Sequence, residues 1–486
     1  NHTTIFTISE SPRDPQVIWV GTDDGNLQVT RDGGGAWSNV ASRVPDLPPG
    51  TWVSHVEASR FDAATVYATF DGHALGDMAT YAYRSRDYGA TWERLGPEGL
   101  EGWAHVLTED LENRDLLFLG TEMGLFISID GGGAWARYET EFPKVAVRDL
   151  AIHPREQDLL IATHGRGIWI LDDITPLRSL TAAALGAELV ILPTRPAVMT
   201  VGSGVQAFPG NDEFVGRNPP EAASIVYYQS RRHVFGDMRV EILDADGGVL
   251  TTLAAGKLRG MNRVDWPMRL PMPKMPAATT LVPVFQGPMV EEGEHRFRIV
   301  KGPKTYEGTV TLVPDPRADY SAEDRRLQQR TALELYRMLE RLTYVVDAAT
   351  DLRDQTRRAA DSTRGGTARR LGQLADSLEA FRGSLVATSE GGQLSGDEKL
   401  REHLGSLFGS VNGFAGKPTA SELARLEILR GRLDGAFSRF GGLTGDQQLG
   451  PLNRSLQQAG HAPLELLSEE QWRSRAVGGA GGGLER

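Results

Sequence analysis

The sequence predicts a mostly β protein with an α-helical C-terminal part: β-propeller blades in an incomplete ring, then an immunoglobulin-like β-sandwich, then a helical bundle or hairpin. Two observations predict this order. The segment GTDDGNLQVTRDGGGAW near the start of the chain recurs downstream as GTEMGLFISIDGGGAW, and such repeats are the signature of repeat architectures. Strand-like alternation then gives way to helix-like periodicity near residue 318.

Size and composition narrow the class of protein. The chain has 486 residues, too many for one ordinary core, and 40% hydrophobic with 24% charged residues is typical of globular proteins. The net charge of −12 would repel a phosphate backbone, so we expect no nucleic-acid partner. The absence of cysteine excludes disulfides and thiolate metal sites. No cofactor and no metal site are predicted, and no motif supports a structural cation.

The repeats share a short motif, Ser/Thr-x-Asp-x-Gly-x-x-Trp, which we call the Asp box. Its chemistry is that of a hairpin turn, since aspartate accepts hydrogen bonds from nearby backbone amides and glycine tolerates a positive φ. The tryptophan then packs beneath the turn. We therefore predict a structural role for the box residues Asp32, Trp37, Asp87, Trp92, Asp130 and Trp135.

A fourth unit, LIATHGRGIWILDD, keeps the strands but loses the box glycines. Repeat units of roughly 43 to 55 residues with four strands each have the size of propeller blades. Residues 1–178 are therefore predicted to form four blades. Four large blades rarely close a ring, so we expect further upstream blades or a partner chain to complete it.

A ligand face follows from the position of the box. If the box joins the third and fourth strands of a blade, the turns between the second and third strands emerge at the opposite edge, beside the connections between blades. Asp46, His55 and His105 fall there. Candidate ligand-binding residues at this edge are Asp23, Asp24, Trp52, His73, Trp103, His164 and Arg166. The catalytic candidates, should a carboxylate pair cleave a glycosidic bond, are Asp71, Asp77 and Glu122.

Each of these residues also has a structural interpretation. Aspartate and glycine form such turns without any ligand, and Arg166 could pair with carboxylates of other blades. Tryptophans at this edge could stack on sugars, while the carboxylates could hold a basic peptide. The sequence does not measure a distance between two carboxylates, so it leaves hydrolysis open.

The boxes, the GTDDGN and GTEMGLF turns, and the segment AVRDLAIHPR followed by ATHGRGIWILDDITPLR resemble bacterial Asp-box (BNR) repeat proteins. Those are described as sortilin-like or glycosyl-hydrolase-like. The resemblance is specific over residues 5–178 and looser over residues 222–317. It implies a propeller longer than four blades, of which this chain is a C-terminal portion. It also implies a secreted, periplasmic or cell-envelope protein.

The rest of the chain divides into three stretches. Residues 179–221 are predicted as a linker with one strand candidate at 188–192, and residues 222–317 as the sandwich. The Met- and Pro-rich loop 268–289 either touches a neighbour or fills a gap. Residues 318–475 are predicted as helices whose apolar residues step by three and four, a module for partners or oligomers. Residues 476–486 are predicted as a flexible tail.

Three functions remain open at this point. The first is a binding or scaffold module for a peptide, a protein or a glycan. The second is a xyloglucanase-like glycoside hydrolase, which needs two facing carboxylates beside Trp52 or Trp103. The third is a structural subunit of a larger assembly. The sialidase pattern of three arginines with a Tyr/Glu pair cannot be assembled here, and the residue usage favours the first function.

Overall fold

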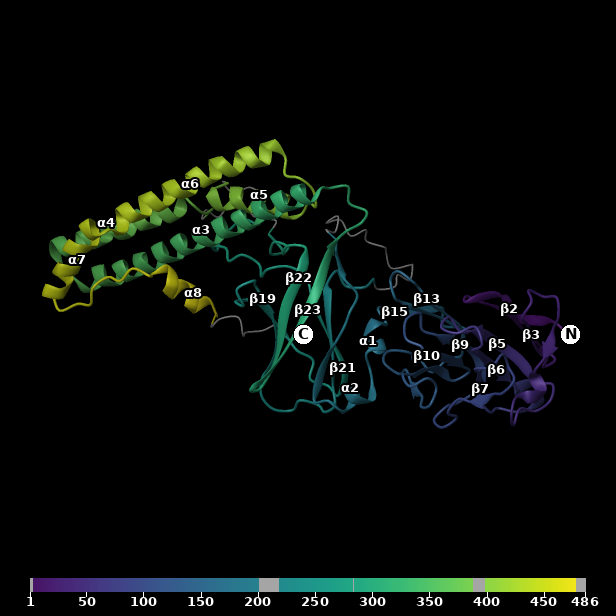
Figure 1. Ribbon diagram of the computed structural model, residues 1–486. Helices are drawn as coiled ribbons and strands as arrows, with labels where there is room; N and C mark the ends of the chain where they lie inside the picture. The colour runs from purple at the N-terminus through teal and green to yellow at the C-terminus, as the bar shows by residue number, and fades with distance from the viewer. Residues whose placement is uncertain (1–2, 201–217, 283, 388–397, 478–486) are drawn as a thin grey trace.

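The computed structural model describes residues 3–200, 218–282, 284–387 and 398–477. Three parts follow one another along an elongated molecule, with the blades at one end, two packed sheets in the middle and long helices at the other end (Figure 1). The predicted order of β and then α structure is confirmed. Most of the predicted tail and residues 201–217 of the predicted linker lie outside the described residues.

Four antiparallel sheets form the propeller-like part. Blades 1 to 3 have four strands each, and blade 4 has three among the described residues. The first strands of successive blades, β1, β5, β9 and β13, lie side by side. The strands are β1 (Ile5–Ser11), β2 (Asp14–Thr22), β3 (Leu27–Thr30) and β4 (Ser38–Asn39) in blade 1; β5 (Trp52–Ala58), β6 (Val66–Asp71), β7 (Tyr81–Ser85) and β8 (Glu93–Arg94) in blade 2; β9 (Ala104–Glu109), β10 (Leu117–Thr121), β11 (Gly124–Ser128) and β12 (Ala136–Arg137) in blade 3; and β13 (Val147–Ile152), β14 (Leu159–Thr163) and β15 (Ile168–Leu171) in blade 4.

Each blade buries an apolar face against the next one. Separate hydrophobic clusters fill the spaces between blades 1 and 2, between blades 2 and 3, and between blades 3 and 4. Unlike the faces between blades, the two outer faces of the stack are not covered. Phe6 and Ile8 on β1 are exposed at one end, and Ile168 and Ile170 on β15 are exposed at the other. In the described chain, the four blades therefore form a stack with an uncovered apolar face at each end.

Two sheets with a shared core form the middle part. Tyr227, Trp266 and Phe297 are fully buried between them. One sheet has the order β16 (Leu189–Leu192), β18 (Ala223–Gln229), β21 (Gly260–Trp266), and the other the order β17 (Ala197–Met199), β23 (Lys304–Pro314), β22 (Gly293–Lys301), β19 (Met238–Leu243), β20 (Val249–Ala254). The immunoglobulin-like type stays a prediction.

The stretch predicted as a linker contains ordered elements. The helix α1 (Thr175–Arg178) ends the blades, and α2 (Ala182–Gly186) follows. The strand β16, close to the expected strand at 188–192, pairs with β18, and β17 pairs in parallel with β23. Chain before residue 222 therefore contributes one strand to each sheet of the middle part.

Six helices form the C-terminal part of the described chain: α3 (Ala322–Ser362), α4 (Gly365–Gly383), α5 (Leu400–Asn412), α6 (Ala420–Thr444), α7 (Asp446–Gln458) and α8 (Glu469–Val477). The Ser321 side chain accepts a hydrogen bond from the Asp324 amide and caps α3. The predicted apolar stripe of α3, which includes Leu335, Leu342 and Leu352, is buried in one helical core. Within the described ranges, no helix combines the length and apolar character needed to cross a bilayer.

The Met- and Pro-rich loop between β21 and β22 fastens the sheets to the helices. Thr280 Oγ1 donates to Glu402 Oε1 at 2.7 Å, and Arg401 Nε donates to the Pro276 carbonyl at 2.9 Å. Thr343 of α3 donates to the Lys274 carbonyl at 2.7 Å. The loop therefore touches a neighbour within the same chain, one of the two roles expected for it.

Candidate functional site

The three Asp boxes form one edge of the blades, which we call the box edge. In blade 3, Asp130 Oδ1 accepts the Ala134 amide at 2.9 Å and the Ser128 hydroxyl at 2.8 Å. The first two boxes repeat these bonds with Asp32 and Asp87. Burial raises the pKa of Asp130, but its hydrogen bonds outweigh burial and lower it overall. The box carboxylates are therefore ionised acceptors of local donors.

Two of the three box tryptophans pack toward the preceding blade. Trp92 of blade 2 makes an edge-to-face contact with Trp19 of blade 1, with ring centroids 6.2 Å apart. Trp135 of blade 3 packs against a cluster that includes Leu95 of blade 2. Trp37 belongs to blade 1 and is 43% exposed, whereas Trp92 is 8% exposed. The exposure of Trp37 follows from the uncovered face of blade 1.

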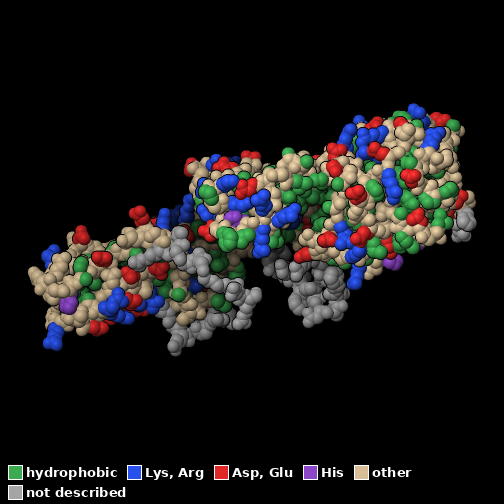
Figure 2. Space-filling view, turned by 90° about the horizontal axis from the view of Figure 1, so that it is seen from below, with side chains coloured by type: hydrophobic (Ala, Val, Ile, Leu, Met, Phe, Trp, Pro, Cys, Tyr) green, Lys and Arg blue, Asp and Glu red, His purple; other side chains and the backbone are tan. Residues whose placement is uncertain are grey.

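The opposite edge of the blades, which we call the loop edge, carries the turns between second and third strands. These turns lie against the connections between blades, since Thr80 donates to the Gly102 carbonyl and Thr121 to the Glu101 carbonyl. Side chains of different blades consequently meet here, as the sequence analysis expects. In Figure 2 acidic and basic side chains are interspersed over the face that it shows, so charge alone marks no site on that face.

Asp71, His73 and Trp103 lie together at the loop edge. His73 Nδ1 is 2.6 Å from Asp71 Oδ1, and because a carboxylate only accepts, Nδ1 carries the proton. The His73 ring stacks on Trp103 of blade 3, with centroids 4.9 Å apart and planes 18° apart. The Asp71 side chain is 3% exposed, whereas that of His73 is 40% exposed. The buried carboxylate thus holds an accessible imidazole on the indole.

Glu122 joins the same cluster through His105, whose ring contacts Trp103 edge-on with centroids 6.2 Å apart. Glu122 Oε2 is 3.0 Å from His105 Nε2 and 3.2 Å from an Arg148 guanidinium nitrogen. A second Arg148 nitrogen lies 3.4 Å from His105 Nδ1. Arginine only donates, so Nδ1 accepts and the proton of the neutral ring is on Nε2, facing Glu122. Burial lowers the pKa of His105 against the opposing hydrogen bond to Glu122, so the ring is neutral at pH 7.

We call this arrangement the loop-edge cluster: Asp71, His73, Trp103, His105, Glu122 and Arg148. It offers solvent an imidazole stacked on an indole, and an ion pair between Glu122 and the 45% exposed side chain of Arg148. These groups can exchange their partners for the hydrogen-bonding groups of a ligand. No group of three or more histidine, aspartate or glutamate residues suited to a metal ion occurs in the described chain.

The third catalytic candidate, Asp77, has a different environment. Its carboxylate accepts the Tyr81 hydroxyl at 2.7 Å and the Ala79 amide at 3.0 Å. The Tyr81 hydrogen bond, with that from Ala79, lowers the pKa of Asp77. Asp77 thus closes its own loop as an ionised acceptor.

The remaining candidates lie outside the cluster. Asp23 accepts the Thr4 amide, and Asp24 accepts Thr22 and Asn26 side chains, within blade 1. The ring of Trp52 contacts Phe6 edge-on between blades 1 and 2, with centroids 4.6 Å apart. His164 and Arg166 lie on an exposed turn of blade 4, where each is followed by a positive-φ glycine, Gly165 and Gly167.

Arg148 is the residue of the cluster that the sequence analysis missed, and a β-bulge explains its position. The pairing of the first strand with the second skips one residue in every blade: Phe6, Ser54, His105 and Arg148. Bulges bend a strand and redirect a side chain. Arg148 does lie within AVRDLAIHPR, a segment on which the family resemblance rests, but the bulge is visible only in the strand register.

Comparison with known families supports the blade architecture. Residues 80–174 match the family model described as sortilin, neurotensin receptor 3 (Sortilin-Vps10), which confirms the predicted resemblance over this stretch. No curated protein matches the chain.

Solved structures with similarity to the chain have low TM-scores. YCF48 from Cyanidioschyzon merolae has a TM-score of 0.26 and 17% identity, over 34% of this chain and 52% of that one. YCF48 bound to a D1 peptide has a TM-score of 0.27 and 18% identity, over 35% and 50%. The GH74 xyloglucanase from Xanthomonas campestris has a TM-score of 0.30 and 13% identity, over 63% and 44%. The match thus spans about half the length of the YCF48 chains.

Proposed function

We propose that the chain is a noncatalytic, sortilin-like binding module whose loop-edge cluster takes a peptide segment of another protein. The observation that carries this proposal is the meeting of three blades at groups that are held in place yet accessible. His73 is fixed by Asp71 and Trp103, and Arg148 is fixed by Glu122. Prearranged donors and acceptors of this kind lower the entropy cost of binding.

A peptide fits the cluster better than a sugar does. Sugar recognition uses a free aromatic face, whereas the Trp103 face carries the stacked His73 ring. A peptide offers carboxylates and carbonyls to the Arg148 guanidinium and amides to Glu122. Glycan binding is therefore the second outcome to test.

The hydrolase alternative finds less support. A general acid needs a raised pKa, whereas hydrogen bonding lowers the pKa of Asp77. Asp71 is buried and accepts both the backbone amide and the ring of His73. Release of reducing ends from xyloglucan by the purified chain, lost in the Glu122→Gln variant, would establish the hydrolase instead.

The test is binding of the purified chain to two arrays, one of immobilised peptides and one of oligosaccharides. We expect signals from peptides with acidic side chains, and these signals should fall at least about tenfold in Arg148→Ala and in His73→Ala. Arg155→Ala is the matched control, because Arg155 is an 82% exposed arginine of blade 4 between β13 and β14, outside the cluster. Acidic-peptide signals that persist in both cluster variants, or signals from oligosaccharides alone, would refute peptide binding at the cluster.

Two further proposals concern the setting of the module. The uncovered faces with Phe6, Ile8, Ile168 and Ile170 support completion of the stack by further blades or by a partner chain. A native mass well above 53.0 kDa for the purified chain would support self-association through these faces or through the helices. A location outside the cytoplasm rests on the family resemblance, and cell fractionation would test it.

A further inference from the structure

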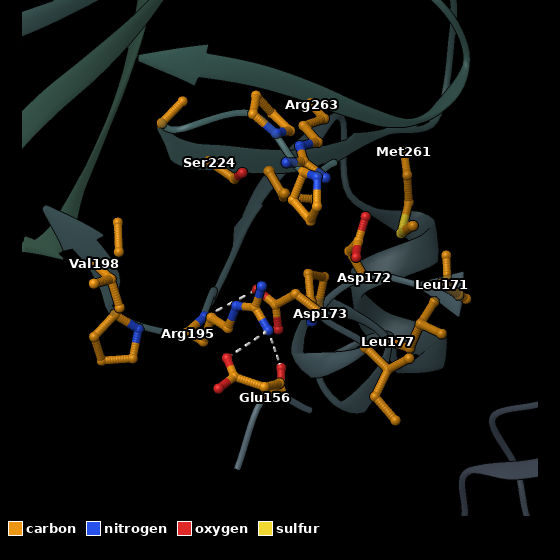
Figure 3. A pocket seen from close by; sticks show the side chains of 18 of the residues that line it. Glu156, Leu171, Asp172, Asp173, Leu177, Arg195, Val198, Ser224, Met261 and Arg263 are labelled. Carbon is orange, nitrogen blue, oxygen red and sulfur yellow. Dashed lines mark hydrogen bonds and ion pairs between the residues drawn. The ribbon is translucent and has the colours of Figure 1, made fainter. Parts of the chain in front are cut away.

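A cleft of about 760 Å³ lies between blade 4 and the sheet that contains β21 (Figure 3). Its walls come from the end of β15, from α1, from the chain around Arg195 and from β18 and β21. This volume is within the range of ligand sites in proteins. The cleft contains no residue of the loop-edge cluster, so a ligand in the cleft would bind apart from the proposed peptide site.

Much of the cleft wall is apolar. Leu171 and Leu177 line it from blade 4 and α1, while Val198 and the 47% exposed Met261 line it from the sheets. Exposed apolar side chains within a hollow favour a ligand that brings an apolar segment of its own.

The arginines that line the cleft are already neutralised. Each has a carboxylate partner within 2.9 Å, which leaves little positive charge for an anionic ligand. The pairs are Arg195 with Asp158, Arg263 with Asp265, and Arg317 with Asp315.

Two carboxylates in the cleft lack such partners. Neither Asp172 nor Glu221 has a hydrogen bond or an ion pair with another residue in the part of the chain that the structure describes. Figure 3 shows the Asp172 side chain in the space between blade 4 and the strand with Met261 and Arg263, without an interaction drawn to it. Arg263 lies near Asp172 and Arg269 lies near Glu221, but neither arginine bonds to them, so the cleft has carboxylates without a direct partner beside apolar walls.

The degenerate fourth box explains why Asp172 is unpaired. Asp173 occupies the box position, as Asp130 does in blade 3, and its carboxylate accepts the amides of Thr175 and Arg195 at 3.2 and 3.0 Å. Asp172 precedes it and takes no part in the turn. Burial, together with Asp158 and Asp173, raises the pKa of Asp172 despite the nearby Arg263 and Arg195. A bound cation would relieve this cost.

We propose that the cleft binds the cationic side chain of a lysine or arginine from a basic peptide. Its aliphatic stem lies against Met261 and Leu171, and its charged end meets Asp172, with Glu221 as a second carboxylate. Long cationic side chains pair an apolar stem with a charged tip in this manner. The net charge of −12 attracts such a partner over longer distances.

The experiment measures fluorescence polarisation of labelled hexapeptides whose central residue, flanked by leucines, is lysine, arginine or glutamine. With the full chain we expect the lysine and arginine peptides to bind about tenfold more tightly than the glutamine peptide. Asp172→Asn should remove this difference and Glu221→Gln should reduce it. The matched control is Glu307→Gln on β23, an exposed carboxylate outside the cleft, which should change nothing.

Two further variants test cation binding in the cleft without changing Asp172 or Glu221. Arg263→Gln removes a cation near Asp172 and leaves Asp265 without its arginine partner, so it should strengthen binding of the lysine peptide several-fold, even if Asp172→Asn does not fold. Arg148→Ala should leave the lysine preference intact. Equal binding of the lysine and glutamine peptides, no effect of either cleft variant, or loss of the preference in Arg148→Ala would overturn the proposal.

Discussion

The two edges of the blades use carboxylates in different ways. At the box edge, Asp130 accepts donors from its own turn, within a few residues of the chain. At the loop edge, Glu122 accepts donors from His105 in its own blade and from Arg148 in the next blade. The first arrangement is local and closes a turn, while the second connects blades through a partly exposed ion pair. The box edge therefore maintains the fold, and the loop edge has groups available for a partner.

The largest expected difference between the edges concerns two arginines. Arg178 near the box edge makes two bonds to Asp110, at 2.8 and 2.9 Å. The side chains of Arg178 and Asp110 are 8% and 0% exposed. Arg178→Met therefore leaves the buried Asp110 carboxylate without its partner and should lower the free energy of unfolding by about 3–5 kcal/mol. Arg148→Met at the loop edge should cost about 1 kcal/mol or less, because its pair is half-exposed.

Urea denaturation followed by tryptophan fluorescence measures both variants. Equal losses of stability in Arg178→Met and Arg148→Met would contradict the division between a structural edge and a binding edge.

A smaller difference is expected between two box tryptophans. Trp92→Ala empties a buried space against Trp19 of the preceding blade and should cost about 3 kcal/mol. Trp37→Ala should cost about 1 kcal/mol or less, because Trp37 lacks a preceding blade in the described chain and is 43% exposed. Thermal unfolding compares the two variants, and a larger loss for Trp37→Ala would mean that another segment covers blade 1 in solution.

The pH dependence of stability should differ between the two halves of β5. Burial raises the pKa of Glu57, toward the box edge, to about 8. The folded state then keeps the Glu57 proton, which the unfolded chain releases near pH 4.5. The stability that Glu57 contributes is therefore lost as the pH rises from about 4.5 to about 8. Glu57→Gln still accepts the Glu109 amide and should remove up to about 1.4 kcal/mol per pH unit from that slope. Identical pH profiles of unfolding for wild type and variant would count against a partly buried, protonated Glu57.

The pH dependence of stability that comes from His55, two residues earlier and toward the loop edge, should have the opposite sign. Burial lowers the pKa of His55 to about 4, against the opposing charge of Asp149. The unfolded chain takes up a proton near pH 6.5 that the folded state refuses, so this contribution is lost as the pH falls from about 6.5 to about 4. His55→Asn should make the free energy of unfolding fall less steeply at acid pH. We expect this to be the smallest of the four effects, because a protonated His55 can turn toward water. An unchanged acid limb would refute the assignment.

How much of this structure can be predicted from sequence depends on how local its interactions are. The boxes around Asp32, Asp87 and Asp130 are readable because donor, acceptor and glycine lie within one short motif. The strand at 188–192 is readable as an apolar run, but its pairing with β18 is not, since sheet partners lie far along the chain.

The candidate site was predictable only in part. The alternation of strands and turns places Asp71, His73, Trp103 and Glu122 at one edge, where the structure brings them together. Arg148 joins them through a bulge, which changes the side-chain direction without a sequence signature. Asp77 was a candidate by type and position, yet its hydrogen bond to Tyr81 commits it to its own loop.

The separation of a structural edge from a binding edge can be tested in one variant. Peptide-array binding and urea denaturation of Arg148→Ala, each compared with wild type, measure the two properties in the same protein. We predict a loss of acidic-peptide signal of at least about tenfold with a change in unfolding free energy of about 1 kcal/mol or less. Acidic-peptide binding at the wild-type level in a folded Arg148→Ala variant would contradict the proposal that the loop-edge cluster binds a partner.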